Sequence, residues 1–229
     1  SLRCIDAAHA DDRGTWITPG LFDLQVNGIA GIDFADPDVT VERLAEADGL
    51  LRAKGISRWL PTIVTRDAAT IEAVLARFAE ARSLGAIPGG AGMHVEGPYI
   101  SPHDGYRGVH QLRFVRDPDP AELARFQQIC GGFIRLVTIA PERPGAEAFT
   151  RAAVAMGIRV AMGHTGATAE ETARAADAGL TLCTHLFNGC AQLVDRHANV
   201  IYAQLAEDRL WGCFIADGHH VPMPALRVG

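Results

Sequence analysis

The 229-residue chain lacks the features that mark several large classes of protein. No apolar run approaches the roughly 20 residues that a membrane-spanning helix needs, and the first ten residues have neither the basic flank nor the apolar stretch of a secretion signal. No block of Lys and Arg occurs, and 27 acidic residues outweigh 21 basic ones, for a net charge of -6. We therefore expect a cytoplasmic protein that binds neither membrane nor nucleic acid.

The sequence also lacks paired cysteines. A zinc site built on cysteine would need paired C-x-x-C spacings, and none is present. The five cysteines are odd in number and lie mostly within or beside apolar stretches: Cys4, Cys130, Cys183, Cys190 and Cys213. We expect them to be reduced thiols packed among apolar side chains.

The chain does contain enough apolar residues for a large core, since 48% of its residues are hydrophobic and 21% are charged. Short apolar runs alternate with longer amphipathic stretches. The apolar runs predict buried strands at 21–26, 59–64, 92–95, 133–139, 158–162, 180–184 and 211–216. The amphipathic stretches predict helices at 41–53, 69–83, 121–129, 147–156, 169–178 and, from a weaker pattern, 200–206.

Local signals mark the ends of these helices. Thr168 followed by Glu171 is the sequence pattern of a capping box. Glycine readily takes the left-handed conformation that ends a helix. Glycines stand where such ends are expected, at Gly55, Gly85, Gly157 and Gly179.

Seven strands, each but the last followed by a helix, indicate a parallel sheet built from right-handed crossover units, with both faces covered. A (β/α)8 barrel and a doubly wound sheet both fit this alternation, and the spacing of the strands leaves the choice between them open. No Gly/Ser-rich linker or charge run divides the chain. We therefore expect one domain of the α/β class.

Polar residues follow three of the apolar runs, at the level where the loops of a parallel barrel assemble an active site. Glu96 follows the third run, His164 the fifth and His185 the sixth. A carboxylate and two imidazoles from three strand ends can converge on one point and leave a position open for water, as in a catalytic metal site. Each residue alone could be a helix cap or a hydrogen-bonded structural group. Their common level favours a metal site.

Further polar residues lie near the same level. Gln25 and Asn27 end the first run on one face, and their amides suit hydrogen bonds to a substrate or water better than metal binding. A strand-end turn is the alternative. His94 lies two residues before Glu96, so it faces the same side of the strand. It either lines the pocket or orients Glu96.

Loop residues complete the set of candidates. His219 and His220 follow the seventh run, and strand alternation directs one of them toward the pocket. A pair on the surface is the alternative. Arg196 and His110 are loop cations outside any strand. Loop charges are usually solvated, so a role in binding phosphate or carboxylate depends on the neighbours of these two residues.

Five strings, taken in order along the chain, resemble one family. They begin at Ile17, His94, Gly163, Thr184 and Ala216, and they read ITPGLFDLQVNG, HVEGP, GHTGAT, THLFN and ADGHHV. Together they resemble the N-acetylglucosamine-6-phosphate deacetylases of the amidohydrolase superfamily. The resemblance covers nearly the whole chain. It favours the barrel over the doubly wound sheet and implies a TIM-type (β/α)8 metal-dependent hydrolase.

The resemblance implies a metal centre. Glu96, His164 and His185 match the metal ligands of the family, in agreement with the convergence expected from the strand ends. Many relatives in the superfamily carry His-x-His at the end of the first strand and hold two metals, whereas this chain has Gln25 and Asn27 there. One divalent metal per subunit is therefore expected, with zinc as the leading choice and iron or another divalent ion as alternatives.

The resemblance also implies contacts with a sugar phosphate. Asn188 and Gly189 match a pair that binds the substrate phosphate through amide and backbone N–H groups. Arg196 and His110 match phosphate-contacting positions, some of which a neighbouring subunit supplies in the family, so a homodimer is expected. His220 is the member of the histidine pair that matches the residue facing the sugar. It is the expected catalytic residue, placed to stabilise an oxyanion together with the metal.

The implied reaction is the metal-dependent deacetylation of N-acetylglucosamine-6-phosphate to glucosamine-6-phosphate and acetate. A metal such as zinc lowers the pKa of its bound water toward ~7, which supplies a nucleophile near neutral pH. Two alternatives stay open. One is a relative acting on N-acetylgalactosamine-6-phosphate or another N-acyl amine, and the other is a catalytically inactive relative that binds a sugar phosphate.

The chain departs from the family pattern in two places. The family's general base is an aspartate at the end of the eighth strand, and we expect it beyond Gly229 because no matching motif precedes that residue. Most of the family's small flanking β-sandwich is also missing. We expect residues 1–16 to be a remnant of the sandwich or a linker, and residues 17–229 to form an incomplete barrel of about seven strands. Its unpaired edges leave the activity of this chain by itself open.

Overall fold

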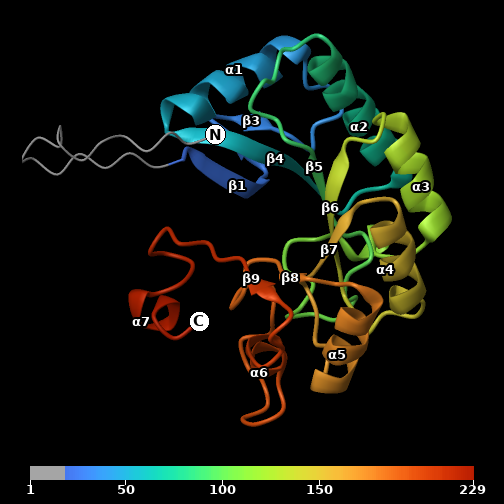
Figure 1. Cartoon of the computed structure of the whole chain (residues 1–229), viewed down its shortest axis with the longest axis vertical. Helices are drawn as coiled ribbons and strands as arrows, with labels where there is room; N and C mark the ends of the chain where they lie inside the picture. Colours follow the sequence, from blue (N-terminus) through green and yellow to red (C-terminus); the bar gives the residue numbers. More distant parts are fainter. Residues whose placement is uncertain (1–18) are drawn as a thin grey trace, which may run out of the picture.

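The computed structural model describes residues 19–229, so the segment 1–16 and Cys4 lie outside the described residues. Within them, a seven-stranded sheet curls into an open arc (Figure 1). Every neighbouring pair in this sheet is parallel. In spatial order its strands are β1 (Leu21–Val26), β4 (Ile56–Val64), β5 (Met93–Glu96), β6 (Ile134–Ile139), β7 (Arg159–Met162), β8 (Leu182–Cys183) and β9 (Trp211–Gly212).

The order of the strands confirms the barrel that the family resemblance implies. A doubly wound sheet reverses its strand order at a switch point. Here the order across the sheet follows the order along the chain without reversal. The fold is therefore an incomplete TIM-type barrel. Among residues 19–229, no strand pairs with the outer edges of β1 and β9, which end the arc in Figure 1 and confirm the expected open barrel.

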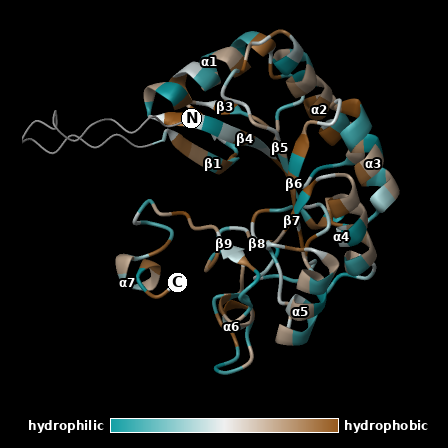
Figure 2. Cartoon of the chain, in the orientation of Figure 1, coloured by the Kyte–Doolittle hydropathy of each residue, from teal (hydrophilic) through white to brown (hydrophobic). Residues whose placement is uncertain are grey.

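Helices join successive strands and lie on the outside of the arc (Figure 1). They carry both hydrophilic and hydrophobic residues (Figure 2), as expected for helices with one face on the sheet and the other in solvent. None of the helices in the described part of the chain is long and apolar enough to cross a membrane. These helices are α1 (Val41–Ala53), α2 (Ala68–Ser83), α3 (Pro120–Ile129), α4 (Ala146–Ala155), α5 (Ala169–Ala178) and α6 (Val200–Leu205).

A group of aromatic rings fills part of the core between the outer helices and the sheet. The rings of Phe34 and Trp59 stack at 5.2 Å, and Phe78 packs edge-on against Phe34 at 5.7 Å. All three side chains are fully buried. The buried carboxylate of Asp48 accepts hydrogen bonds at Oδ1 from Trp59 Nε1 and the backbone of Gly89, and its Oδ2 pairs with Arg52 Nε at 2.8 Å, so its burial is compensated.

The predicted helix ends are confirmed. Thr168 and Glu171 form a reciprocal capping box at the start of α5. The glycines at the predicted helix ends all have positive φ angles: Gly55 (86°), Gly85 (68°), Gly157 (75°) and Gly179 (108°). Four cysteines are free, as predicted: Cys130 and Cys183 are buried, whereas Cys190 and Cys213 are half-buried.

The sequence overestimates two strands and misses several short elements. The last two apolar runs predict five and six strand residues, but β8 and β9 contain two each. The reason is that an apolar run extends a strand only as far as a neighbouring strand pairs with it. The missed elements are too short to show a periodicity. They are the hairpin of β2 (Gly28–Ile29) and β3 (Ile32–Asp33), the 3-10 turn Leu112–Phe114 and α7 (Met223–Leu226).

Candidate active site

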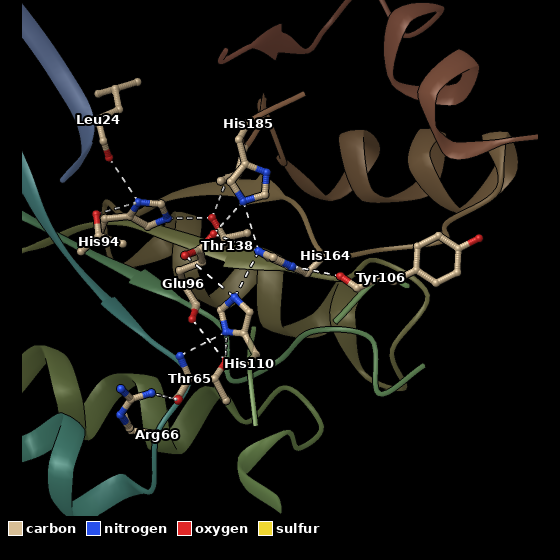
Figure 3. Close-up of polar contacts among 12 residues, drawn as sticks. Leu24, Thr65, Arg66, His94, Glu96, Tyr106, His110, Thr138, His164 and His185 are labelled. Carbon is tan, nitrogen blue, oxygen red and sulfur yellow. Dashed lines mark hydrogen bonds and ion pairs between the residues drawn. The ribbon is translucent and has the colours of Figure 1, made fainter. Parts of the chain in front are cut away.

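The three predicted metal ligands meet at one end of the sheet. Glu96 is the last residue of β5, whereas His164 and His185 follow β7 and β8 by two residues each. All three side chains are buried. One ligand atom from each lies within 4.8 Å of the other two, and Figure 3 shows the side chains pointing toward one another. The predicted convergence is therefore confirmed, and their role as ligands is taken up below as a proposal.

The distances in this cluster suit a divalent metal. Glu96 Oε1 lies 3.1 Å from His164 Nε2 and 2.9 Å from His185 Nε2, and the two Nε2 atoms are 3.1 Å apart. A tetrahedral zinc ion with bonds of about 2.0–2.2 Å holds neighbouring ligand atoms about 3.3–3.6 Å apart, a few tenths of an ångström more than the distances here. The spacing and the donor set of one carboxylate and two imidazoles both fit such an ion.

Hydrogen bonds set the charge and the proton positions of these groups. His164 Nδ1 lies 3.0 Å from the carbonyl oxygen of Tyr106, which can only accept, so Nδ1 carries the proton and Nε2 presents its lone pair. His185 Nδ1 is buried and has no hydrogen-bond partner in residues 19–229. Burial alone would raise the pKa of Glu96, but the two imidazoles beside its carboxylate hold that pKa well below its usual value. Glu96 is therefore an ionised carboxylate, as a metal ligand must be.

A fourth side chain, His110, points into the same cluster. Its Nε2 lies 3.1 Å from His164 Nε2 and 4.0 Å from Glu96 Oε2. The backbone N–H of Thr65 donates to His110 Nδ1 at 3.3 Å, so the proton of the neutral ring is on Nε2. His110 thus presents an N–H where His164 presents a lone pair, and Figure 3 shows the two ring nitrogens facing each other.

His110 is not the solvated loop cation that the sequence suggests. The side chain is buried, and burial lowers the pKa of His110 to about 4, with the neighbouring His164 acting in the same direction. The ring is therefore neutral at pH 7. The match of His110 to a phosphate-contacting position stays a prediction.

His94 links strands on the inner side of the sheet. Its Nδ1 donates to the carbonyl oxygen of Leu24 in β1 at 3.2 Å, so its Nε2 accepts from the Thr138 hydroxyl at 2.7 Å. Thr138 Oγ1 in turn lies 2.7 Å from Thr184 Oγ1. Burial lowers the pKa of His94 to about 4. His94 therefore joins β1, β5 and β6 as a neutral group close to Glu96.

The predicted amide residues of the first strand lie beside a hollow. Gln25 and Asn27 line a space of about 820 Å³ between β1 and the segment that follows β9. His185 and Asp217 border the same space. Asn27 is exposed and Gln25 is half-buried, so both can reach a molecule in this hollow.

Asn188 and Gly189 lie in the loop after β8, next to the cluster. Asn188 donates its backbone N–H to the carbonyl oxygen of His185 at 2.8 Å, and its side-chain Nδ2 is buried without a hydrogen-bond partner in residues 19–229. Gly189 has a φ angle of 63°, and a Cβ at this position would lie 2.7 Å from His185 Cε1. Only glycine fits here, because any side chain would displace the His185 ring.

The remaining predicted residues lie outside the cluster. Arg196 is exposed in the loop between β8 and α6. His219 and His220 are exposed after β9, and His220 Nδ1 lies 2.7 Å from Asp217 Oδ2. The structure does not bring these side chains to Glu96, and their functional roles stay predictions.

Sequence reasoning missed Thr65, Tyr106 and Thr138. Thr65 directly follows β4 and Thr138 lies in β6, so their strand-end positions were a usable signal. Tyr106 fixes His164 through a backbone carbonyl, and no side-chain pattern could have predicted that contact.

Fold and site together define a class of protein. The chain forms an α/β barrel of the TIM type, open on one side, whose strand ends bring together a carboxylate and imidazoles in a spacing that suits a divalent metal. The class is therefore that of α/β barrels with a candidate metal site at the strand ends, where barrels of this type place their active sites.

Comparisons with known proteins narrow the class. The N-acetylgalactosamine-6-phosphate deacetylase of Escherichia coli O157:H7 is 36% identical over 214 residues, which are 92% of this chain and 55% of that protein. The N-acetylglucosamine-6-phosphate deacetylase of Bos taurus is 33% identical over 234 residues, 95% of this chain and 55% of that protein. No protein-family model matches.

Solved structures agree. The N-acetyl-D-glucosamine-6-phosphate deacetylase of Mycobacterium smegmatis superposes with a TM-score of 0.81 at 36% identity, covering 91% of this chain and 53% of that one. A mutant of that enzyme in complex with N-acetyl-D-glucosamine-6-phosphate gives a TM-score of 0.80. The resemblance to these deacetylases is thus confirmed over nearly the whole chain. The chain spans about half the length of the relatives it matches.

Proposed function

We propose that this chain serves the metal-dependent deacetylation of N-acetylglucosamine-6-phosphate to glucosamine-6-phosphate and acetate, as a hydrolase of a linear amide bond. The convergence of Glu96, His164 and His185 carries the proposal, because these groups come from three separate strand ends. Similarity to relatives named as deacetylases supports it, as does the solved complex of the M. smegmatis enzyme with this sugar phosphate. Residues 17–229 would form the barrel domain of this function.

Glu96, His164 and His185 would hold one divalent metal, for which we expect zinc. The ionised carboxylate and the Nε2 lone pair of His164 face each other at a spacing that fits the ion. When bound, such a metal supplies Lewis-acid chemistry that activates water near neutral pH and polarises a carbonyl. Gln25 and Asn27 offer weaker amide ligands at the first strand, so a single metal is proposed.

The chain's own groups would bind and orient the substrate. His110 Nε2–H is a donor aimed at the cluster, suited to an acetamide oxygen. The buried Nδ2 of Asn188 has no partner in residues 19–229, and it would donate to the phosphate together with the backbone N–H of Gly189. Phosphate held away from the reacting carbon fixes the amide in place. His220 would face the sugar.

We further propose a homodimer, in which Arg196 contacts the phosphate in a neighbouring subunit. Arg196 shares an exposed loop with Leu193, whose side chain is 93% exposed. Light scattering on the purified chain tests the dimer. Arg196→Ala tests the phosphate contact, because it should raise KM for the sugar phosphate and leave metal content unchanged. The absence of a spanning helix in residues 19–229 is compatible with the cytoplasm, which we propose as the location.

The metal assignment is tested by zinc content and acetate release. We expect one zinc per chain in the wild type and less than a tenth of that in Glu96→Gln and His185→Asn. Glu147→Gln is the matched control, because Glu147 pairs with Arg174 on the surface at 3.0 Å. Full zinc content in Glu96→Gln, or unchanged acetate release when the same substitution is made in the full-length gene product, would show that the metal lies elsewhere.

A second candidate substrate is N-acetylgalactosamine-6-phosphate. The relatives from Escherichia coli O157:H7 and Shewanella, at 36% and 34% identity, are named for that sugar, whereas those from Bos taurus and Haemophilus influenzae, at 33% and 32%, are named for the glucosamine epimer. Rates of acetate release from both sugars decide between them. Calorimetric binding of the sugar phosphate without turnover by the full-length gene product would indicate the inactive binding module instead.

A further inference from the structure

Glu142 lies in the loop between β6 and α4, and its carboxylate contacts the loop that carries His164. The hydroxyl of Thr165 donates to Glu142 Oε2, and the backbone N–H of Gly166 donates to Glu142 Oε1 at 2.9 Å. Thr165 Oγ1 also accepts from the backbone N–H of Ala167 at 3.0 Å. Both oxygens of one carboxylate therefore hold the two residues that directly follow His164.

The backbone of His164 needs such support. Its φ angle is 52°, in the left-handed region that non-glycine residues seldom occupy. A residue keeps this conformation only where the surrounding structure fixes it. Ser101 donates its N–H to the carbonyl oxygen of His164 at 3.0 Å. Before the imidazole, Gly163 donates its N–H to the carbonyl oxygen of Ile139 at 3.0 Å, and after it Glu142 holds Thr165 and Gly166, so residues on both sides of His164 are anchored.

The same loop also holds the ring of His164 in its proton state. Gly166 packs against the ring of Tyr106, because a Cβ at Gly166 would lie 2.9 Å from Tyr106 Cζ. The backbone carbonyl of Tyr106 accepts from His164 Nδ1 at 3.0 Å and keeps Nε2 free of a proton. A shift of Gly166 would therefore disturb both the position of the loop and the hydrogen bond that sets the tautomer.

We propose that Glu142 is a positioning residue for the metal centre: by holding Thr165 and Gly166 it fixes the imidazole of His164 in its ligand geometry. The inference rests on the proposed function, in which His164 is a metal ligand. Groups that orient metal ligands typically change metal affinity 10- to 100-fold when they are removed.

The test compares four variants with the wild-type chain. Glu142→Ala removes both acceptors, and Glu142→Gln keeps one side-chain oxygen. Thr165→Val removes the hydroxyl of the wild-type side chain, whereas Thr165→Ser keeps it. Three properties are measured on each: zinc affinity by competition with a chromophoric chelator, the visible absorption spectrum of the cobalt(II)-loaded chain, and hydrogen exchange of the Gly166 amide in the metal-free chain.

We expect zinc affinity to fall about 10- to 100-fold in Glu142→Ala, with a changed cobalt spectrum and faster exchange at Gly166. Thr165→Val should lose less, and Thr165→Ser should return to the wild-type values. The far-ultraviolet circular dichroism spectrum should stay unchanged. Glu147→Gln, which removes a surface ion pair on α4, should alter none of the three properties.

The inference is overturned if Glu142→Ala binds zinc within twofold of the wild type and gives the same cobalt spectrum. If Glu142→Ala does not fold, the contrast between Thr165→Val and Thr165→Ser decides in the same way. The proposed function fails separately if the wild type binds no zinc, or if His185→Asn binds it as well as the wild type. In that case, hydrogen exchange of the Gly166 amide that is the same in Glu142→Ala and the wild type would show that Glu142 does not hold Gly166.

Discussion

The middle of the sheet and its two ends differ in how well they are covered. In the middle, β4 to β7 pair on both sides, and every residue of β5 is buried. At one end, Leu21 and Phe22 of β1 are 63% and 54% exposed. At the other end, β8 and β9 have two residues each, and Trp211 is 77% exposed.

The candidate site follows this difference in part. The proposed ligands Glu96, His164 and His185 are all buried, although His185 follows β8 near one end of the sheet. Of the groups proposed to meet the substrate, His110 is also buried, whereas Gln25 and His220 lie near the ends and are more exposed. A metal site needs ligands fixed within a fraction of an ångström. A buried scaffold supplies that precision, whereas substrate-binding groups have to be reachable from solvent.

The largest effect is expected from truncating a ring in the covered part. Phe78 on α2 is fully buried and packs against Phe34. Phe78→Ala should lower the free energy of unfolding by about 3–5 kcal/mol, because it removes apolar contacts and leaves a cavity. Urea denaturation measures the loss, with Phe78→Leu as a milder control. A loss below about 1 kcal/mol would contradict the core described above.

A smaller effect is expected where a hydroxyl links the strands of the middle. Thr138 donates to His94 Nε2 and lies 2.7 Å from Thr184 Oγ1. Thr138→Val should cost about 1–3 kcal/mol, because the buried imidazole loses its donor while the shape is kept. Thr138→Ser retains the hydroxyl and should lose clearly less. Equal urea midpoints for Thr138→Val and the wild type would show that His94 has another partner.

Raising the pH above 10 should lower the free energy of unfolding, because of Tyr99. Burial, together with the carboxylate of Glu122 that accepts its hydroxyl at 2.7 Å, raises the pKa of Tyr99 above its ordinary value of 10.0. Its contribution to stability is therefore complete below pH 10 and falls as pH rises further, since the unfolded chain releases the proton first. The slope for one proton is about 1.4 kcal/mol per pH unit. Urea midpoints between pH 9 and 11 measure it, and Tyr99→Phe should flatten the curve.

The smallest effect is expected at the exposed end. Trp211→Ala removes a side chain that is mostly in solvent, so the free energy of unfolding should change by less than about 0.5 kcal/mol. With Trp16 replaced by Phe in both chains, iodide should quench fluorescence much less after Trp211→Ala, because Trp59 is fully buried. A loss of about 2 kcal/mol or more would show that β9 is covered in solution, and the contrast between the two regions would then fail.

Much of the fold could be predicted because its signals are local. The bounds of β1, α1 and α5 agree with the predicted runs, and the capping box at Thr168 is formed as predicted. Periodicity and capping depend on residues within a few positions of one another, so the sequence displays them directly. Strands β8 and β9 are shorter than predicted because their length depends on neighbours far away in the chain.

The candidate ligands could be predicted because strand ends in a parallel sheet share one level. That rule predicts that Glu96, His164 and His185 lie close together, and it needs no measured distance to do so. It says nothing of His110, which arrives from a loop and is buried by its surroundings. Nor does it show Glu142, whose contacts with Thr165 and Gly166 depend on how two loops pack.

The sequence by itself determined the longer helices and strands, the helix ends and the polar residues that share one edge of the sheet. Only the tertiary structure decided how short β8 and β9 are, that His110 joins the cluster as a neutral donor, and that Glu142 anchors the loop of His164. The physical reason is the range of the forces involved. Backbone periodicity is local, whereas burial, proton position and loop packing depend on groups that are distant in the chain and adjacent in space.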